Sequence, residues 1–261
     1  MNYNFHTHTY RCGHASGGEE DYIKRAIDGG IKHMGFSDHI PYVFPDGFES
    51  PHRIPMNEVC DYFKTINELR EKYKNQIEIY IGFEMEYYPE HFDSMLSIAK
   101  SSGAEYLILG QHFMYNEHPS GYPCQALCNT EKEIEHYTDC IVSGIKSGVF
   151  TYVAHPDILN FFLEGDNIEL YKEKMEELCL ASKGTDTPLE INFLGIREKR
   201  RYPNDAFWEI AGKVGAPVTF GFDSHSVLSA YDDESLKIAE KLVEKYKLNY
   251  IGEPKLKSLH F

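Results

Sequence analysis

Two kinds of hydrophobic pattern alternate along the chain. Short runs such as IEIYIGF are almost continuously apolar, which is typical of buried parallel strands. Between these runs, apolar residues recur every three or four positions, which is typical of amphipathic helices. We predict strands at 2–7, 32–37, 77–83, 105–111, 150–154, 188–193 and 217–222. We predict helices near 18–28, 56–73, 89–101, 131–146, 168–182, 204–214 and 233–247.

This alternation favours an α/β fold with a parallel sheet and helical crossovers. Seven such units without a visible boundary predict a distorted seven-stranded (β/α)7 TIM-like barrel, with residues 1–261 forming a single domain. A doubly wound open sheet is the alternative. It is disfavoured because the glycine signature of dinucleotide-binding folds does not follow the first strand.

Composition narrows the class of protein. The 261 residues are 42% hydrophobic and 26% charged, as in ordinary soluble globular proteins. A formal net charge of −15 argues against a sequence-independent nucleic-acid-binding protein, which would need a basic surface. The six cysteines form no C-x-x-C pair, so free thiols in a reducing compartment are favoured over a structural zinc site at Cys124 and Cys128. With no signal peptide or membrane-spanning apolar run, the sequence predicts a cytoplasmic protein that binds no membrane.

Most residues able to do chemistry stand at the C-terminal ends of the predicted strands. They are His6, His8, Asp38, His39, Glu84, His112, His155, Asp223 and His225, with His14 following the first strand after a short loop. In a parallel barrel these strand ends share one face, where active sites are built. Residues i and i+2 of a strand point to the same side, so His6 and His8 can converge, as can Asp223 and His225.

Imidazole and carboxylate groups that converge in this way predict a metal site. They suit zinc, manganese or iron, whereas calcium and magnesium prefer oxygen ligands alone. A tetrahedral site takes about four ligands, so this set exceeds the need of one ion and predicts two or three divalent transition-metal ions. Glu84 is suited to bridge two of them because its carboxylate has two oxygens. A lone buried histidine is usually a satisfied core residue, but that interpretation would have to account for each strand end separately.

The order and spacing of these residues resemble the polymerase and histidinol phosphatase (PHP) superfamily. The resemblance rests on an initial H-x-H, a third histidine after a short loop, S-D-H after the second strand, G-x-E, two isolated histidines and a late D-x-H. It runs from residue 6 to about residue 225. The segments FSDHIPY, IYIGFEMEYYPE and EINFLGIREKRRYP are similar to the histidinol-phosphatase branch.

The resemblance implies a distorted seven-stranded barrel with three metal ions. Transferred by position, the three ligand sets are His6, His8, Glu84 and Asp223; Glu84, His112 and His155; and His14, His39 and His225. It also implies that Arg197 binds the substrate phosphate, and Arg53 is a weaker candidate for the same contact. His52, beside Arg53, lies in a loop that could cover the rim and contact substrate.

By the same resemblance, the expected activity is hydrolysis of L-histidinol phosphate to L-histidinol and phosphate, in histidine biosynthesis. A hydroxide bridging the metal ions would attack phosphorus, with Glu84 and Asp223 holding the ions and Arg197 steadying the phosphate oxygens. Asp38 would serve as the general acid or orient a ligand histidine, and the second role is favoured. Phe193 and Phe222 replace residues that are usually small in this branch, so they could reshape the pocket.

Three other functions remain open at this point. A PHP-type phosphoesterase acting on nucleotides or other small phosphate esters would have the same metal site. An amidohydrolase-type C–N hydrolase also uses H-x-H on a barrel, but here Glu84 comes early and no lysine ends the fourth strand. A non-enzymatic metal-binding module is disfavoured because the ligand set is convergent and open. The segment 115–130 is expected to lie on the active rim, as a lid or as a plain connection.

Overall fold

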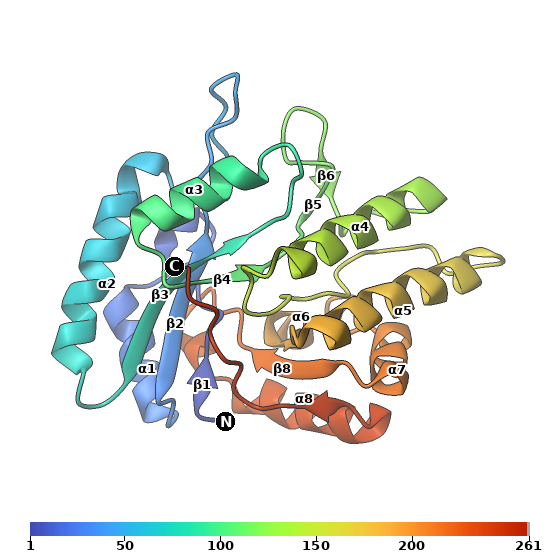
Figure 1. Ribbon diagram of the computed structural model, residues 1–261. Coiled ribbons are helices and arrows are strands. Elements are labelled where there is room, and N and C mark those ends of the chain that lie inside the picture. Colours follow the sequence, from blue (N-terminus) through green and yellow to red (C-terminus); the bar gives the residue numbers. More distant parts are fainter. Residues whose placement is uncertain (260–261) are drawn as a thin grey trace.

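Short parallel strands form the centre of the fold. The computed structural model describes residues 1–259 and shows an α/β protein with its helices outside a curled parallel sheet (Figure 1). One sheet contains, in order, β1 (Tyr3–Asn4), β2 (His33–His39), β3 (Glu78–Met85) and β4 (Tyr106–Leu109). A second contains β7 (Leu189–Asn192), β8 (Pro217–Gly221) and β9 (Asn249–Tyr250). Every pair of neighbouring strands within these two sheets is parallel.

Single bridges bring the two sheets together. Val153 forms a parallel bridge to Leu109 at the end of β4 and another to Leu189 at the start of β7. On the other side, Thr7 after β1 bridges to Ser224 after β8. Through these bridges the two sheets form one curled surface, in which the chain after β1 lies beside the chain after β8.

The predicted α/β class is confirmed, but the count of seven barrel strands is not. The segment predicted as the fifth strand, 150–154, forms isolated bridges rather than a continuous strand. Its extension stops because His155 adopts a positive φ of 31°, which turns the chain directly after Ala154. The antiparallel hairpin of β5 (Phe113–Met114) and β6 (Tyr122–Pro123) was not predicted; β5 directly precedes the expected rim segment 115–130 and β6 lies within it.

The helices follow the predicted positions closely. They are α1 (Glu19–Asp28), α2 (Val59–Tyr73), α3 (Phe92–Ser102), α4 (Glu131–Ser147), α5 (Asn167–Thr185), α7 (Asp205–Val214) and α8 (Asp233–Tyr246). There are also four short elements: α6 (Phe193–Arg197) and the 3-10 turns η1 (Tyr10–Cys12), η2 (Met56–Glu58) and η3 (Val227–Ala230). The helix predicted at 56–73 includes η2, and the other three were not predicted. These four have at most five residues each, too few for a hydrophobic period to show.

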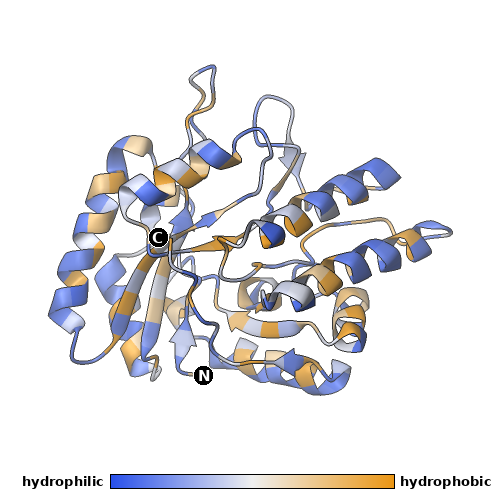
Figure 2. Ribbon diagram, viewed as in Figure 1, coloured by the Kyte–Doolittle hydropathy of each residue, from blue (hydrophilic) through white to orange (hydrophobic). Residues whose placement is uncertain are grey.

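Local chemistry explains where several helices begin. Thr130 and Glu133 form a reciprocal capping box at α4, while the Asn204 side chain accepts from two backbone amides of α7. Along the helices, hydrophobic and hydrophilic residues alternate (Figure 2). In α2 this pattern buries Val59, Tyr62 and Ile66 on one face.

Two further features concern the length of the helices and the cysteines. No helix within residues 1–259 is both long and apolar enough to cross a membrane. All six cysteines are free thiols, and Cys60 is the exposed one among them.

Ile66 supplies a test of the packing between helix and sheet. Its side chain is fully buried, so Ile66→Ala should lower the free energy of unfolding by about 2–5 kcal/mol, through lost apolar burial and the cavity left behind. Glu68 is exposed on the same helix, so Glu68→Ala should change stability by less than about 0.5 kcal/mol. Urea denaturation followed by circular dichroism measures both. Equal effects of the two substitutions would contradict this account of α2.

Candidate metal centre

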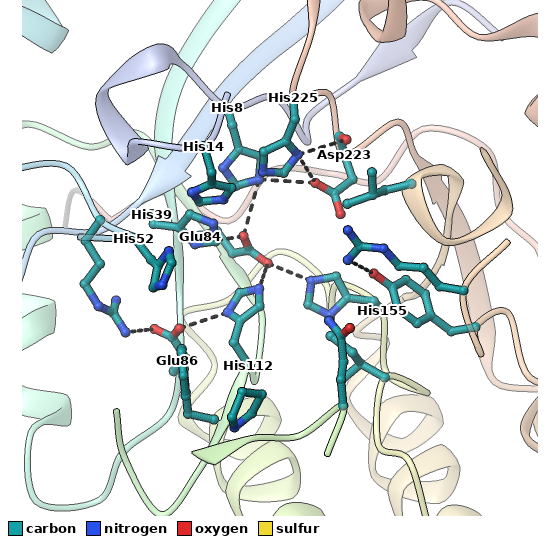
Figure 3. A pocket seen from close by; sticks show the side chains of 18 of the residues that line it. His8, His14, His39, His52, Glu84, Glu86, His112, His155, Asp223 and His225 are labelled. Atoms are coloured by element: carbon teal, nitrogen blue, oxygen red, sulfur yellow. Dashed lines mark hydrogen bonds and ion pairs between the residues drawn. The ribbon is translucent and has the colours of Figure 1, made fainter. Parts of the chain in front are cut away.

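A cavity of about 390 Å³ opens at the C-terminal ends of the parallel strands (Figure 3). The nine residues predicted to bind metal converge here from the ends of β1, β2, β3, β4, β8 and the segment before His155. Eight of them line the cavity: His8, His14, His39, Glu84, His112, His155, Asp223 and His225. His6, the ninth, is fully buried and lies against Glu84 and Asp223.

Glu84 lies at the middle of this arrangement, and its two oxygens face different histidines (Figure 3). Oε2 lies 3.5 Å from Nε2 of His6, 3.5 Å from Nε2 of His8 and 3.3 Å from Nδ1 of His39. Oε1 lies 3.2 Å from Nε2 of His112 and 2.9 Å from Nε2 of His155. The carboxylate is therefore placed to serve two neighbouring positions at once.

Asp223 closes the arrangement on the β8 side. Its Oδ1 lies 3.6 Å from Nε2 of His6, 3.3 Å from Nε2 of His8 and 3.1 Å from Nδ1 of His225. Its positive φ of 47° turns the chain sharply after β8. Burial opposes ionisation of Asp223, but the nearby His6 and His225 outweigh it and hold the pKa of the carboxyl well below its usual value.

Several atoms facing this space are buried without a hydrogen-bond partner among residues 1–259. They are Nε2 of His6, Nε2 of His8, Oε2 of Glu84 and Oδ1 of Asp223. Buried polar atoms in native proteins are nearly always satisfied, so such a group of imidazole nitrogens and carboxylate oxygens calls for a shared partner. Ligand atoms of His6, His8 and Asp223 lie within 4.8 Å of one another, as do those of His6, Glu84 and His155. These donors fit divalent transition-metal ions.

A further group of histidines lies beside the first. The ring centroid of His14 is 4.8 Å from that of His225 and 5.3 Å from that of His39. Burial, together with the charges of His225 and His8, lowers the pKa of His14 to about 4. The imidazole is therefore neutral near pH 7, which is the form that binds metals.

Two further carboxylates, Asp38 outside the cavity lining and Glu86 within it, orient two of these histidines. Asp38 Oδ1 lies 3.3 Å from Nδ1 of His8, and Glu86 Oε1 lies 2.9 Å from Nδ1 of His112. Asp38 is fully buried, does not line the cavity and also accepts hydrogen bonds from the backbone and hydroxyl of Thr9. This placement supports the predicted orienting role of Asp38 and does not support a general acid in contact with substrate.

Arg197 does not reach the cavity. Its guanidinium donates to Oδ2 of Asp232 at 2.9 Å, to the carbonyl of Asp223 at 3.2 Å and to that of Phe222. The cause is α6, which starts directly after β7 with Asn192 as its cap and carries Arg197 to the side of β8. This placement does not support the predicted phosphate contact, because Arg197 instead holds the backbone of the Asp223 turn.

Arg53 and His52 both line the cavity, as the sequence predicted for their loop. Arg53 is buried and already paired, with Nη2 2.9 Å from Oε2 of Glu86 and Nε 2.7 Å from Oε2 of Glu117. Two carboxylates occupy this guanidinium, so the structure does not support the predicted phosphate contact of Arg53. Glu117 belongs to the expected rim segment 115–130, which also contributes Pro123 and Gln125 to the cavity.

Arg200 and Tyr202 are cavity residues that the sequence interpretation missed. Arg200 donates to Oε2 of Glu198 at 2.8 Å and to the Tyr202 hydroxyl at 3.1 Å. The Tyr202 ring lies 6.0 Å from that of His155. The only available signal was the cation-rich run REKRRYP, which does not reveal which arginine faces the cavity.

Phe193 and Phe222 are fully buried, their ring centroids are 5.2 Å apart, and neither lines the cavity. The expectation that they reshape the pocket directly is therefore not supported. Phe193 directly follows β7 and Phe222 directly follows β8, and the Phe193 ring also packs against Phe220 of β8.

Comparisons with known proteins agree with this geometry. The family described as PHP domain matches residues 4–193. A probable histidinol-phosphatase of Deinococcus radiodurans is 23% identical over 228 residues, covering 84% of this chain and 85% of that protein. The histidinol-phosphatase of Bacillus subtilis is 26% identical over 254 residues, covering 84% and 92%. The histidinol phosphate phosphatase of Lactococcus lactis, solved with zinc, L-histidinol and phosphate, is similar in fold, with a TM-score of 0.71, 19% identity and coverage of 99% and 97%.

Gly110 offers a test of the position of Glu84. A Cβ at residue 110 would overlap the Glu84 carboxylate, so Gly110→Ala should displace it and lower the amount of zinc that the protein retains by about one equivalent or more. Gly184, in α5, has open space around its Cβ position, so Gly184→Ala is the matched control. Elemental analysis after gel filtration of zinc-loaded protein measures both variants. Full zinc retention by Gly110→Ala would show that Glu84 is not a ligand.

Proposed function

Because the chain belongs to the PHP domain family, we propose that it is a metal-dependent phosphomonoester hydrolase whose substrate is L-histidinol phosphate. The products are L-histidinol and phosphate, and the reaction belongs to histidine biosynthesis. The single observation that carries the proposal is the convergence of nine histidine and carboxylate side chains, among them Glu84, whose two oxygens face separate groups of histidines. The relatives named as histidinol-phosphatases support the choice of substrate.

We assign three ligand sets from the distances and the family resemblance. They are His6, His8, Glu84 and Asp223; Glu84, His112 and His155; and His14, His39 and His225. Zinc, manganese and iron all suit such mixed nitrogen and oxygen ligands. When bound, the ions would neutralise phosphate oxygens and lower the pKa of a water molecule so that it becomes a nucleophile at neutral pH.

The protein's own groups arrange the remaining parts of the reaction. Asp38 and Glu86 hold the rings of His8 and His112, so each imidazole presents its other nitrogen to the cavity. Arg200 has a single carboxylate partner in the rim and lies next to the ligands, so we assign it the phosphate contact. Burial raises the pKa of Tyr202, which keeps its hydroxyl protonated and able to donate to a phosphate oxygen.

Three broader features belong to the same proposal. We propose that the chain is a single domain and that its curled sheet acts as a distorted seven-stranded barrel, in which 150–154 takes the place of the fifth strand. A biosynthetic reaction of this kind fits a cytoplasmic location.

Phosphate release from three substrates tests the proposed specificity. We expect kcat/KM for L-histidinol phosphate to exceed that for a nucleoside monophosphate and for an aryl phosphate by about a hundredfold or more. If the nucleotide or the aryl ester is hydrolysed equally well, the protein is a phosphoesterase of other small esters and the assignment to histidinol phosphate is wrong.

Replacing Glu84 tests the shared carboxylate. Glu84→Gln leaves one neutral oxygen where two charged ones faced five histidines, so kcat should fall by about a thousandfold or more. Glu90→Gln, at an exposed position a few residues later, should leave kcat unchanged. Steady-state phosphate release with L-histidinol phosphate measures both, and near-normal turnover of Glu84→Gln would remove Glu84 from its bridging role.

Replacing Arg200 tests the phosphate contact. Arg200→Ala should raise KM for L-histidinol phosphate by about tenfold or more, because a charge-assisted hydrogen bond to phosphate is lost. Arg201 is the exposed neighbour, and Arg201→Ala should leave KM unchanged. An unchanged KM for Arg200→Ala would move the phosphate contact to another residue.

A further inference from the structure

β7 contributes none of the predicted metal ligands, yet two fully buried polar residues point from it to the centre. These are Glu190 and Asn192, which share one face of the strand because they are two positions apart. We propose that Glu190 is a positioning residue of the metal centre, which orients His6 directly and fixes His155 and Asp223 through the backbone and through Asn192. This inference rests on the proposed metal centre and adds to it a group that does not touch the ions.

One carboxylate makes all of these contacts. Oε1 of Glu190 lies 2.8 Å from Nδ1 of His6. Oε2 accepts from the backbone amide of His155 at 3.1 Å and from Nδ2 of Asn192 at 2.8 Å. Nδ2 of Asn192 also donates to Oδ2 of Asp223 at 3.0 Å. Ligands from β1, from the turn after 151–154 and from the end of β8 are thus tied to one residue of β7.

The contact to His6 decides which nitrogen faces the metal centre. In a neutral imidazole whose Nδ1–H donates to Glu190, Nε2 carries the free lone pair. That atom lies 3.5 Å from Oε2 of Glu84 and 3.6 Å from Oδ1 of Asp223, and it has no hydrogen-bond partner among residues 1–259. A carboxylate behind an imidazole also makes the opposite nitrogen a stronger metal ligand.

The neighbouring strand leaves space for this carboxylate. Gly221 of β8 pairs with Asn192, and a Cβ at residue 221 would overlap Oε1 of Glu190. A buried carboxylate is costly unless donors surround it, and here an imidazole, a backbone amide and a side-chain amide supply them. The fold therefore reserves a place for a charge that makes no contact with solvent and does not line the cavity.

Glu190→Gln is the direct test, because glutamine keeps the shape but has only one acceptor oxygen. Whichever way the amide turns, its NH2 group faces a donor, either His6 or the His155 amide. We expect the affinity of the apo-protein for zinc, measured by competition with a chromophoric chelator, to fall by about 10–100-fold. Glu105→Gln is the matched control, since Glu105 also accepts from a backbone amide, that of Ile81, but lies before β4 and away from the cavity. Its zinc affinity should equal that of the wild type.

A double-mutant cycle separates orientation from general damage to the fold. If Glu190 acts chiefly through His6, Glu190→Gln should weaken zinc binding less in a His6→Ala background than in the wild type. An equal loss in both backgrounds, or an unchanged zinc affinity of Glu190→Gln, would overturn the inference. Wild-type protein that binds no zinc would instead contradict the proposed function itself.

A measurement on the wild-type protein tests the role of Glu190 without depending on whether a variant folds. In zinc-loaded protein, ¹⁵N NMR of the imidazole groups should show His6 protonated at Nδ1, with this proton shifted strongly downfield by the carboxylate. Protonation of His6 at Nε2 would overturn the positioning role of Glu190.

Discussion

The burial of one carboxylate among imidazoles is the constraint on which the site depends. Glu84 is 1% exposed, and five histidines lie within 3.5 Å of its two oxygens. A charge buried this deeply is tolerated only where partners surround it, so the ends of four strands and the turn at His155 must all meet at one point. The curl of the sheet achieves this meeting, and Gly110 leaves the space that the carboxylate needs.

Other carboxylates around the site orient the imidazole rings. Carboxylates also pair with the nearby arginines, which limits how many of them can bind the substrate phosphate. Asp38, Glu86 and Glu190 each accept from the Nδ1 side of a ligand histidine, so its Nε2 is directed to the centre. These groups are part of the formal net charge of −15, and a set of divalent cations would offset their negative charge locally. Arg53 is paired with Glu86 and Glu117, and Arg197 with Asp232 outside the cavity lining; we assigned the phosphate contact to Arg200 because it lines the cavity and has one carboxylate partner, Glu198.

The sequence predicted the helices and the convergence of the nine site residues because each prediction rests on a local signal. Periodicity marked helices such as α2, and a histidine or carboxylate at the end of an apolar run marked six of the seven predicted strand ends. Glu190 was missed because, within LEIN, a polar residue in a strand looks like an ordinary outward-facing position, and its partner His6 is 184 residues away. Arg197 was named from the family resemblance and Arg200 was not considered, because the positions of both follow from α6, a helix of five residues that leaves no hydrophobic period. The fifth strand was overestimated because its length depends on the positive φ of His155, which composition does not reveal.

We infer that the two oxygens of Glu84 bind two different metal ions. Anomalous X-ray diffraction at the zinc edge, from crystals of the zinc-loaded protein, is the direct test of this bridging role. We expect one anomalous peak beside Oε2, among His6, His8 and Asp223, and a separate peak beside Oε1, between His112 and His155. A single peak bound to only one oxygen of Glu84, or peaks away from both, would contradict it.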